Sequence, residues 1–136
     1  MNFYYLIAAA LSAVTALAHI ALGGPELVPV LEASGLNAYE VTLSLMLFHI
    51  TTILLLVNSA FLVFAGLGRD RAGAVLLIGI TYGLIGAMFL WQGISRLGTV
   101  WDMPQWLVLG LICGALVLGS RFENRRAQGV TGGGAG

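Results

Sequence analysis

The fold is decided by residues 41–67, which read VTLSLMLFHITTILLLVNSAFLVFAGL and contain no aspartate, glutamate, lysine or arginine. An α-helix needs about 20 consecutive apolar residues to cross the hydrocarbon core of a bilayer. This run is longer than that, so we expect a membrane-spanning helix that tilts or projects past the bilayer surface.

Three more stretches have the same apolar character, and they cover residues 3–22, 72–94 and 104–120. Strands and irregular segments are excluded as spanning elements, because unpaired backbone groups are too costly in hydrocarbon. The sequence therefore predicts an all-α fold, an integral membrane four-helix bundle, over residues 1–122. The glycine-rich residues 123–136 are expected to form a disordered tail.

The composition agrees with a membrane location. Of the 136 residues, 59% are hydrophobic and 9% are charged, and the mean hydropathy is +0.96. A soluble domain carries about 25% charged residues, so these charges can decorate loops but cannot coat a water-exposed globule. The net charge is zero and lysine is absent, which excludes a basic surface for nucleic acid.

The arginines outside the apolar stretches predict the orientation. One side of the expected bundle carries Arg69, Arg71, Arg121, Arg125 and Arg126, and the other side carries Arg96. Because cytoplasmic loops are enriched in arginine and lysine, both termini are predicted to be cytoplasmic. Gly23-Gly24-Pro25 is expected to end the first helix, so that residues 23–40 form an outward-facing loop.

Small and polar residues mark faces where membrane helices can associate, since lipid tails are as apolar as leucine. The third stretch carries Gly79, Gly83 and Gly86, and the fourth carries Gly110 and Gly114. The second stretch carries Ser44, Thr51 and Asn58 at seven-residue steps. We expect these residues to pack against other helices of the chain or against a partner.

His19 and His49 form the candidate functional site, because ionisable residues inside membrane helices are costly to bury. Both are expected at a similar depth in the outer half of the bundle, with Gln92 at the same level. Facing imidazoles could ligate the iron of a haem b, hold a metal ion with Glu26 as a third ligand, or exchange protons around a quinone. They could equally form hydrogen bonds across a helix interface and only fix the packing.

Other chemistry has little support in the sequence. There is no phosphate-binding loop, nucleophile elbow or pair of catalytic carboxylates, so enzyme activity is not supported. Cys113 is the only cysteine, which excludes an intrachain disulfide.

One resemblance to known proteins is apparent. Residues 96–106, RLGTVWDMPQW, together with Ala18-His19 and the GGPE of residues 23–26, resemble small uncharacterised four-helix inner-membrane proteins of proteobacteria. The resemblance implies a multi-pass protein of the bacterial inner membrane. That group carries no assigned activity, so the resemblance bears on topology alone.

A chain with so little mass outside the bilayer has few ways to act except through its neighbours in the membrane. We therefore predict an accessory or scaffold subunit of a larger bacterial membrane complex, such as a respiratory or photosynthetic one. Two alternatives stay open. One is a self-contained haem- or quinone-binding protein that uses His19 and His49 for redox or proton handling, and the other is a small homo-oligomeric transporter.

Overall fold

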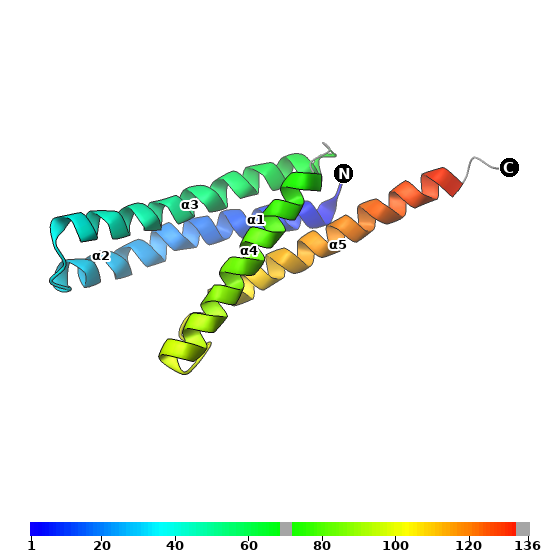
Figure 1. Cartoon of the computed structure of the whole chain (residues 1–136). Helices are drawn as coiled ribbons and strands as arrows, with labels where there is room; N and C mark the ends of the chain where they lie inside the picture. Colours follow the sequence, from blue (N-terminus) through cyan, green and yellow to red (C-terminus); the bar gives the residue numbers. More distant parts are fainter. Residues whose placement is uncertain (69–71, 133–136) are drawn as a thin grey trace.

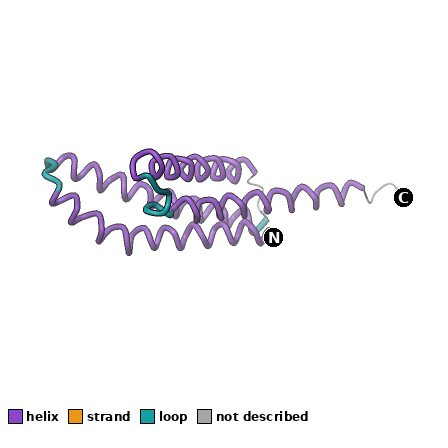
Figure 2. Tube along the Cα trace, turned by 90° about the horizontal axis from the view of Figure 1, so that it is seen from below, coloured by secondary structure: helices purple, strands orange, loops and turns teal. Residues whose placement is uncertain are grey.

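The computed structural model describes residues 1–68 and 72–132, and these residues form helices joined by short connections, without strands (Figure 2). In chain order the elements are α1 (Phe3–Ala18), the π-helical turn η1 (His19–Gly23), α2 (Gly24–Ala33), α3 (Ala38–Gly66), α4 (Ala72–Gln92), the π-helical turn η2 (Gly93–Leu97) and α5 (Gln105–Gly132). Because α1, η1 and α2 run on without a break, the described residues contain 4 helical rods long and apolar enough to cross a membrane. The predicted all-helical fold with four such helices is confirmed.

The rods pair as two hairpins that diverge at one end (Figure 1). In the first hairpin α1 packs along α3, and in the second α4 packs along α5. The hairpins meet mainly through α1 and α5, whereas α3 and α4 have few contacts. Figure 1 shows α4 running obliquely across the first hairpin, so that its C-terminal end lies away from α3.

Small residues on α1 allow it to approach two neighbours at once. Ala8, Ala9, Ser12 and Ala16 are all buried and follow one face of the helix at steps of one, three and four residues. Ser59 of α3 donates a hydrogen bond of 2.8 Å to the backbone oxygen of Ala9. Close backbone approach and side-chain hydrogen bonds are the contacts that join helices without relying on large apolar side chains.

The N-terminus ties three helices together at the end opposite α2. The backbone nitrogen of Asn2 donates to the Gly66 oxygen at 2.7 Å, and its side-chain nitrogen donates to the Gly119 oxygen at 2.8 Å and to Glu123 Oε1 at 3.1 Å. Beside it the hydroxyl of Tyr5 lies 3.1 Å from Ser120 Oγ. We call this set of contacts the Asn2 lock.

The prediction that the first helix ends at residue 22 is wrong, and so is the predicted loop over residues 23–40. The chain stays helical to Ala33, and only a short turn separates α2 from α3. Pro25 has no N–H to donate one turn back, and the π-helical turn η1 widens the helix directly before it. The helix therefore continues through the Gly-Gly-Pro sequence instead of ending there.

The predicted start of the second helix at residue 41 is also too late. Asn37 and Glu40 form a capping box, in which Asn37 Oδ1 accepts from the Glu40 nitrogen at 3.1 Å and Glu40 Oε2 accepts from the Asn37 nitrogen at 2.9 Å. The cap fixes the start of α3 at Ala38.

The predicted disordered tail over residues 123–136 is wrong for residues 123–132, which continue α5. Residues 121–128 are mostly good helix formers, and Arg126 lies over the ring of Phe122 one turn earlier, 5.4 Å from its centroid. Residues 133–136 lie outside the described residues.

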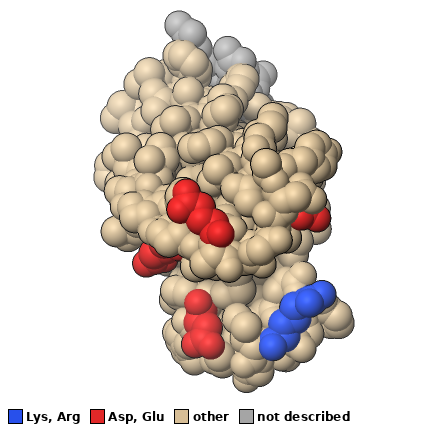
Figure 3. Space-filling model, turned by 90° about the vertical axis from the view of Figure 1, so that its left-hand side faces the viewer, with Lys and Arg blue, Asp and Glu red and all other residues tan. Residues whose placement is uncertain are grey.

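The outside of the molecule is mainly apolar. Side chains such as Val14, Leu84 and Leu111 are more than half exposed although they lie in the middle of long helices. Figure 3, which views the molecule from the end that carries α2, shows a few charged side chains scattered over a largely uncharged surface.

Candidate functional site

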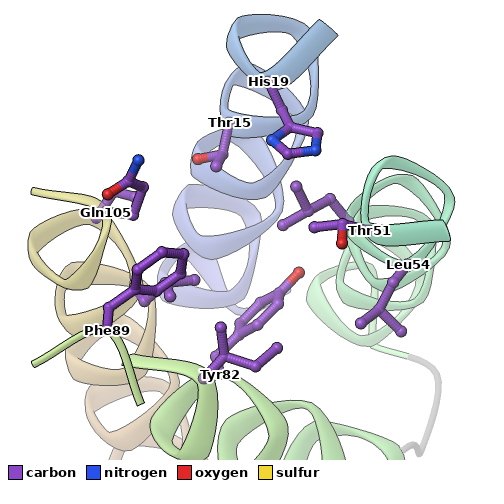
Figure 4. Close-up of a pocket in the computed structure, with 11 residues that line it drawn as sticks. Thr15, His19, Thr51, Leu54, Tyr82, Phe89 and Gln105 are labelled. Atoms are coloured by element: carbon purple, nitrogen blue, oxygen red, sulfur yellow. The ribbon is translucent and has the colours of Figure 1, made fainter. Parts of the chain in front are cut away.

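The divergence of the hairpins leaves a cavity of about 270 Å³ between them, which we call the inter-hairpin cavity (Figure 4). Its lining comes from α1, η1, α3, α4 and α5 and consists of Thr15, His19, Thr51, Leu54, Leu55, Tyr82, Ile85, Phe89, Gln105, Val108 and Leu109. Most of this wall is apolar, and a few polar groups converge on it. That combination is typical of small-molecule sites in proteins.

The floor of the cavity is a buried hydroxyl pair. Ser12 Oγ donates to the backbone oxygen of Leu55 at 2.8 Å, and the Tyr82 hydroxyl lies 2.6 Å from Ser12 Oγ. A serine hydroxyl has one proton. Because the proton of Ser12 is already given to Leu55, Tyr82 is the donor to Ser12. In Figure 4 the Tyr82 hydroxyl is directed at the space below His19 and beside Thr51.

Asn58 of α3 is close to the Tyr82 hydroxyl and is 7% exposed. Its side-chain nitrogen is buried without a hydrogen-bond partner among the described residues. The polar floor therefore joins α1, α3 and α4 where the hairpins begin to separate.

Two threonines line the walls and direct their protons into their own helices. Thr15 donates to the Leu11 oxygen at 2.7 Å, and Thr51 donates to the Leu47 oxygen at 3.1 Å. Such i−4 bonds satisfy the hydroxyl proton and leave lone pairs on the oxygen. In Figure 4 the Thr15 hydroxyl faces Gln105, which comes from the first turn of α5.

His19 forms the upper edge of the cavity. Its ring stacks on that of Phe48, with centroids 4.0 Å apart and an interplanar angle of 19°. Its Nε2 lies 3.2 Å from the Phe48 backbone oxygen. Since a carbonyl oxygen can only accept, Nε2 is the donor, and Nδ1 is an acceptor when the ring is neutral.

His49 does not join His19. Consecutive residues on a helix point about 100° apart, and it is Phe48 that α3 turns toward His19. The Phe48 ring meets His49 edge-on at 5.6 Å, and His49 is exposed. A bis-histidine haem needs two imidazoles on opposite sides of one macrocycle. The stacked Phe48 leaves no such space between them, so this pair does not fit a haem within one chain.

The other predicted site residues are distributed differently. Gln92 is half-buried and does not line the cavity, and Gln105 supplies the amide instead. Glu26 and His19 line a neighbouring hollow of about 470 Å³ between α1, η1, α2 and the start of α5, but His49 does not. No group of three metal-ligating side chains occurs in the described part of the chain.

The predicted packing residues Ser44, Thr51 and Asn58 of α3 lie in three different surroundings. Ser44 is half-buried and donates to the Glu40 oxygen at 2.9 Å, Thr51 lines the cavity and Asn58 is buried. Tyr82 was not among the predicted site residues, although it is the one polar-tipped aromatic residue in the middle of the third apolar stretch. Its isolation among apolar residues is the sequence signal that could have identified it.

The glycines of α4 and α5 fall into two groups. A methyl group at Gly79 or at Gly86 would lie 3.6 Å from a leucine side chain of α5, so these two face the hairpin interior. At Gly83, Gly110 and Gly114 a methyl group would meet nothing within 4 Å. Gly83 and Gly110, with Trp106 and Cys113, line a shallow groove of about 280 Å³ between α4 and α5.

Comparisons with protein-family models, with curated proteins and with solved structures find no match to this chain. The resemblance to proteobacterial inner-membrane proteins therefore stays a prediction from the motifs quoted above.

Proposed function

We propose that this chain is a multi-pass protein of the bacterial inner membrane with both termini in the cytoplasm. The exposed apolar side chains along four long helices support insertion in lipid. The arginine distribution supports the orientation, with Arg121, Arg125 and Arg126 exposed near the end of α5 and Arg96 in η2. Arg69 and Arg71 lie outside the described residues. In this setting the inter-hairpin cavity lies between the middle of the bilayer and its outer side, since its lining residues are midway along α3 and at the start of α5.

We propose that the protein binds a lipid-soluble molecule with a small polar ring as its head, of the quinone class. The observation that carries this proposal is the inter-hairpin cavity, an apolar space edged by Thr15, His19, Thr51, Tyr82 and Gln105. At about 270 Å³ it is just below the usual range for drug-sized ligands, which begins near 300 Å³. It thus suits one substituted ring better than a whole isoprenoid molecule, whose tail would extend outside the cavity.

Filling the cavity tests this proposal. Ile85→Trp places a large ring in the cavity, whereas Leu84→Trp places the same ring on an exposed position of the same helix. We expect the wild type and Leu84→Trp, in lipid nanodiscs, to bind a short-chain benzoquinone or its quinol by equilibrium titration, and Ile85→Trp to lose binding. Equal binding by both variants, or no binding by the wild type, would contradict the proposal.

A second candidate function, an accessory subunit in a larger membrane complex, is supported by the groove between α4 and α5. Gly83 and Gly110 line it without a neighbour within 4 Å, which suits close approach of a transmembrane helix from a partner. We expect Gly83→Leu and Gly110→Leu to lose a companion that co-purifies from native membranes, and Gly73→Leu, an equally open glycine outside the groove, to keep it. If no companion purifies with the wild type, this candidate is discarded.

A further inference from the structure

The direction of the hydrogen bonds around the inter-hairpin cavity determines whether its ligand should donate or accept hydrogen bonds. Tyr82 donates to Ser12 and Ser12 donates to Leu55, while Thr15 and Thr51 donate to carbonyl oxygens of their own helices. Each of these hydroxyl protons is therefore in use before any ligand arrives. What these groups present to the cavity is lone pairs.

His19 also presents a hydrogen-bond acceptor. Its Nε2 proton is given to the Phe48 oxygen, so that Nδ1 of the neutral ring is an acceptor. Gln105 differs, because its side-chain amide carries protons and has no hydrogen bond within the described residues. Among the side chains that line the cavity, acceptors therefore outnumber free donors, and Gln105 is the free donor. The unpaired side-chain nitrogen of Asn58 belongs to a residue that does not line the cavity.

We propose that the cavity selects headgroups that donate hydrogen bonds, so that it takes a quinol in preference to the corresponding quinone. This inference rests on the proposed function. A quinol hydroxyl can donate to Tyr82 Oη, Thr15 Oγ1 or His19 Nδ1 without breaking any bond in the protein. A quinone carbonyl can only accept. Gln105 can donate to one of the two carbonyls, but a donor for the second requires Tyr82 or a threonine to withdraw its proton from an internal acceptor.

The placement of the acceptors suits a ring with two hydroxyl groups. Tyr82 comes from α4 and His19 follows α1, and Figure 4 shows them on opposite sides of the cavity with Thr51 between. A para-substituted ring could therefore donate at both ends. One hydrogen bond kept or lost changes an equilibrium constant by about two- to tenfold. Because the quinone cannot form one or two of these bonds, we expect the quinol to bind about tenfold more tightly than the quinone.

The test compares three probes on the protein in nanodiscs under anaerobic conditions. They are a short-chain benzoquinol, its quinone, and the quinol with both hydroxyls methylated, which has the same ring without donors. The expected order of affinity places the quinol about tenfold ahead of the other two. Equal binding of quinol and quinone would overturn this inference and leave the proposed function standing, whereas no binding of any probe would overturn both.

Two variants test the direction of the hydrogen bonds separately from the packing of the helices. Ser12→Ala removes the acceptor of the Tyr82 proton, so that Tyr82 can donate to a carbonyl. We expect the quinone to gain affinity and the tenfold preference to shrink, a result that mere loosening of the fold would not give. Thr15→Val removes one acceptor at nearly constant shape and should weaken the quinol alone. An unchanged preference in both variants would refute the assignment.

Discussion

The Asn2 lock predicts a large difference between two chemically identical substitutions on α5. In Gly119→Ala the new methyl group would overlap the ring of Tyr5 and lie 3.2 Å from Asn2 Oδ1. In Gly114→Ala, five residues earlier on the same helix, the methyl group would meet nothing within 4 Å. Both changes gain up to about 1 kcal/mol of helix propensity, and only the first must displace the lock.

The magnitude follows from the contacts. Overpacking a well-filled site costs about 1–3 kcal/mol, and moving the Tyr5 ring also strains its hydroxyl contact with Ser120, which is worth about 1 kcal/mol. After the gain in helix propensity, Gly119→Ala should be destabilised by about 2 kcal/mol. Gly114→Ala should be unchanged or more stable by up to about 1 kcal/mol.

Cys113 provides the assay. It is the only cysteine of the chain and is half-buried in the folded protein, with Sγ 3.6 Å from the Gly79 oxygen. Its reaction with a thiol-reactive dye during a thermal ramp in detergent therefore reports unfolding. We expect Gly119→Ala to melt at least about 5 °C below Gly114→Ala. Equal melting temperatures would refute the packing described for Tyr5 and Asn2.

Three further predictions concern other parts of the molecule. A methyl group at Gly93 would lie 2.7 Å from the backbone oxygen of Thr99, so Gly93→Ala should cost about 2 kcal/mol or more in the same thermal assay, and a neutral result would contradict the η2 geometry. His19→Phe should cost about 1 kcal/mol because it removes the bond to the α3 backbone, whereas the exposed His49→Phe should change stability by less than about 0.5 kcal/mol. Asn37→Ala removes the cap of α3 and should cost about 1 kcal/mol, with faster amide hydrogen exchange confined to the first turn of α3.

The sequence was sufficient to predict that four long helices form, but not how each helix is rotated about its own axis. Long apolar runs predict spanning helices well, because length and hydropathy are all that the hydrocarbon core requires. The same apolarity removes the amphipathic pattern that would tell which face is buried. Phe48 and His49 are neighbours in such a run, and only the packing of α3 on α1 decides that Phe48 meets His19.

The glycines illustrate the same limit. Their spacing identified faces that permit close approach, yet Gly79 and Gly86 face α5 while Gly83 is open. The choice depends on the crossing of α4 and α5, which no short spacing encodes. The helix through Gly23-Gly24-Pro25 was missed for a different reason. A π-helical turn allows a helix to continue through a proline, and the Gly-Gly-Pro motif does not show whether such a turn will form.

The Asn2 lock also has a consequence for the order of synthesis. Asn2 donates to Gly119 across 117 positions of the chain, so this partner of Asn2 does not exist until α5 has been synthesised. At about 5–20 residues per second, the interval between the synthesis of the two residues is about 6–23 seconds. Once α3 has been made, the small-residue face of α1 can have α3 beside it but still lacks α5. The newly made first hairpin must therefore be covered by lipid, by an insertase or by another chain until α5 is in place.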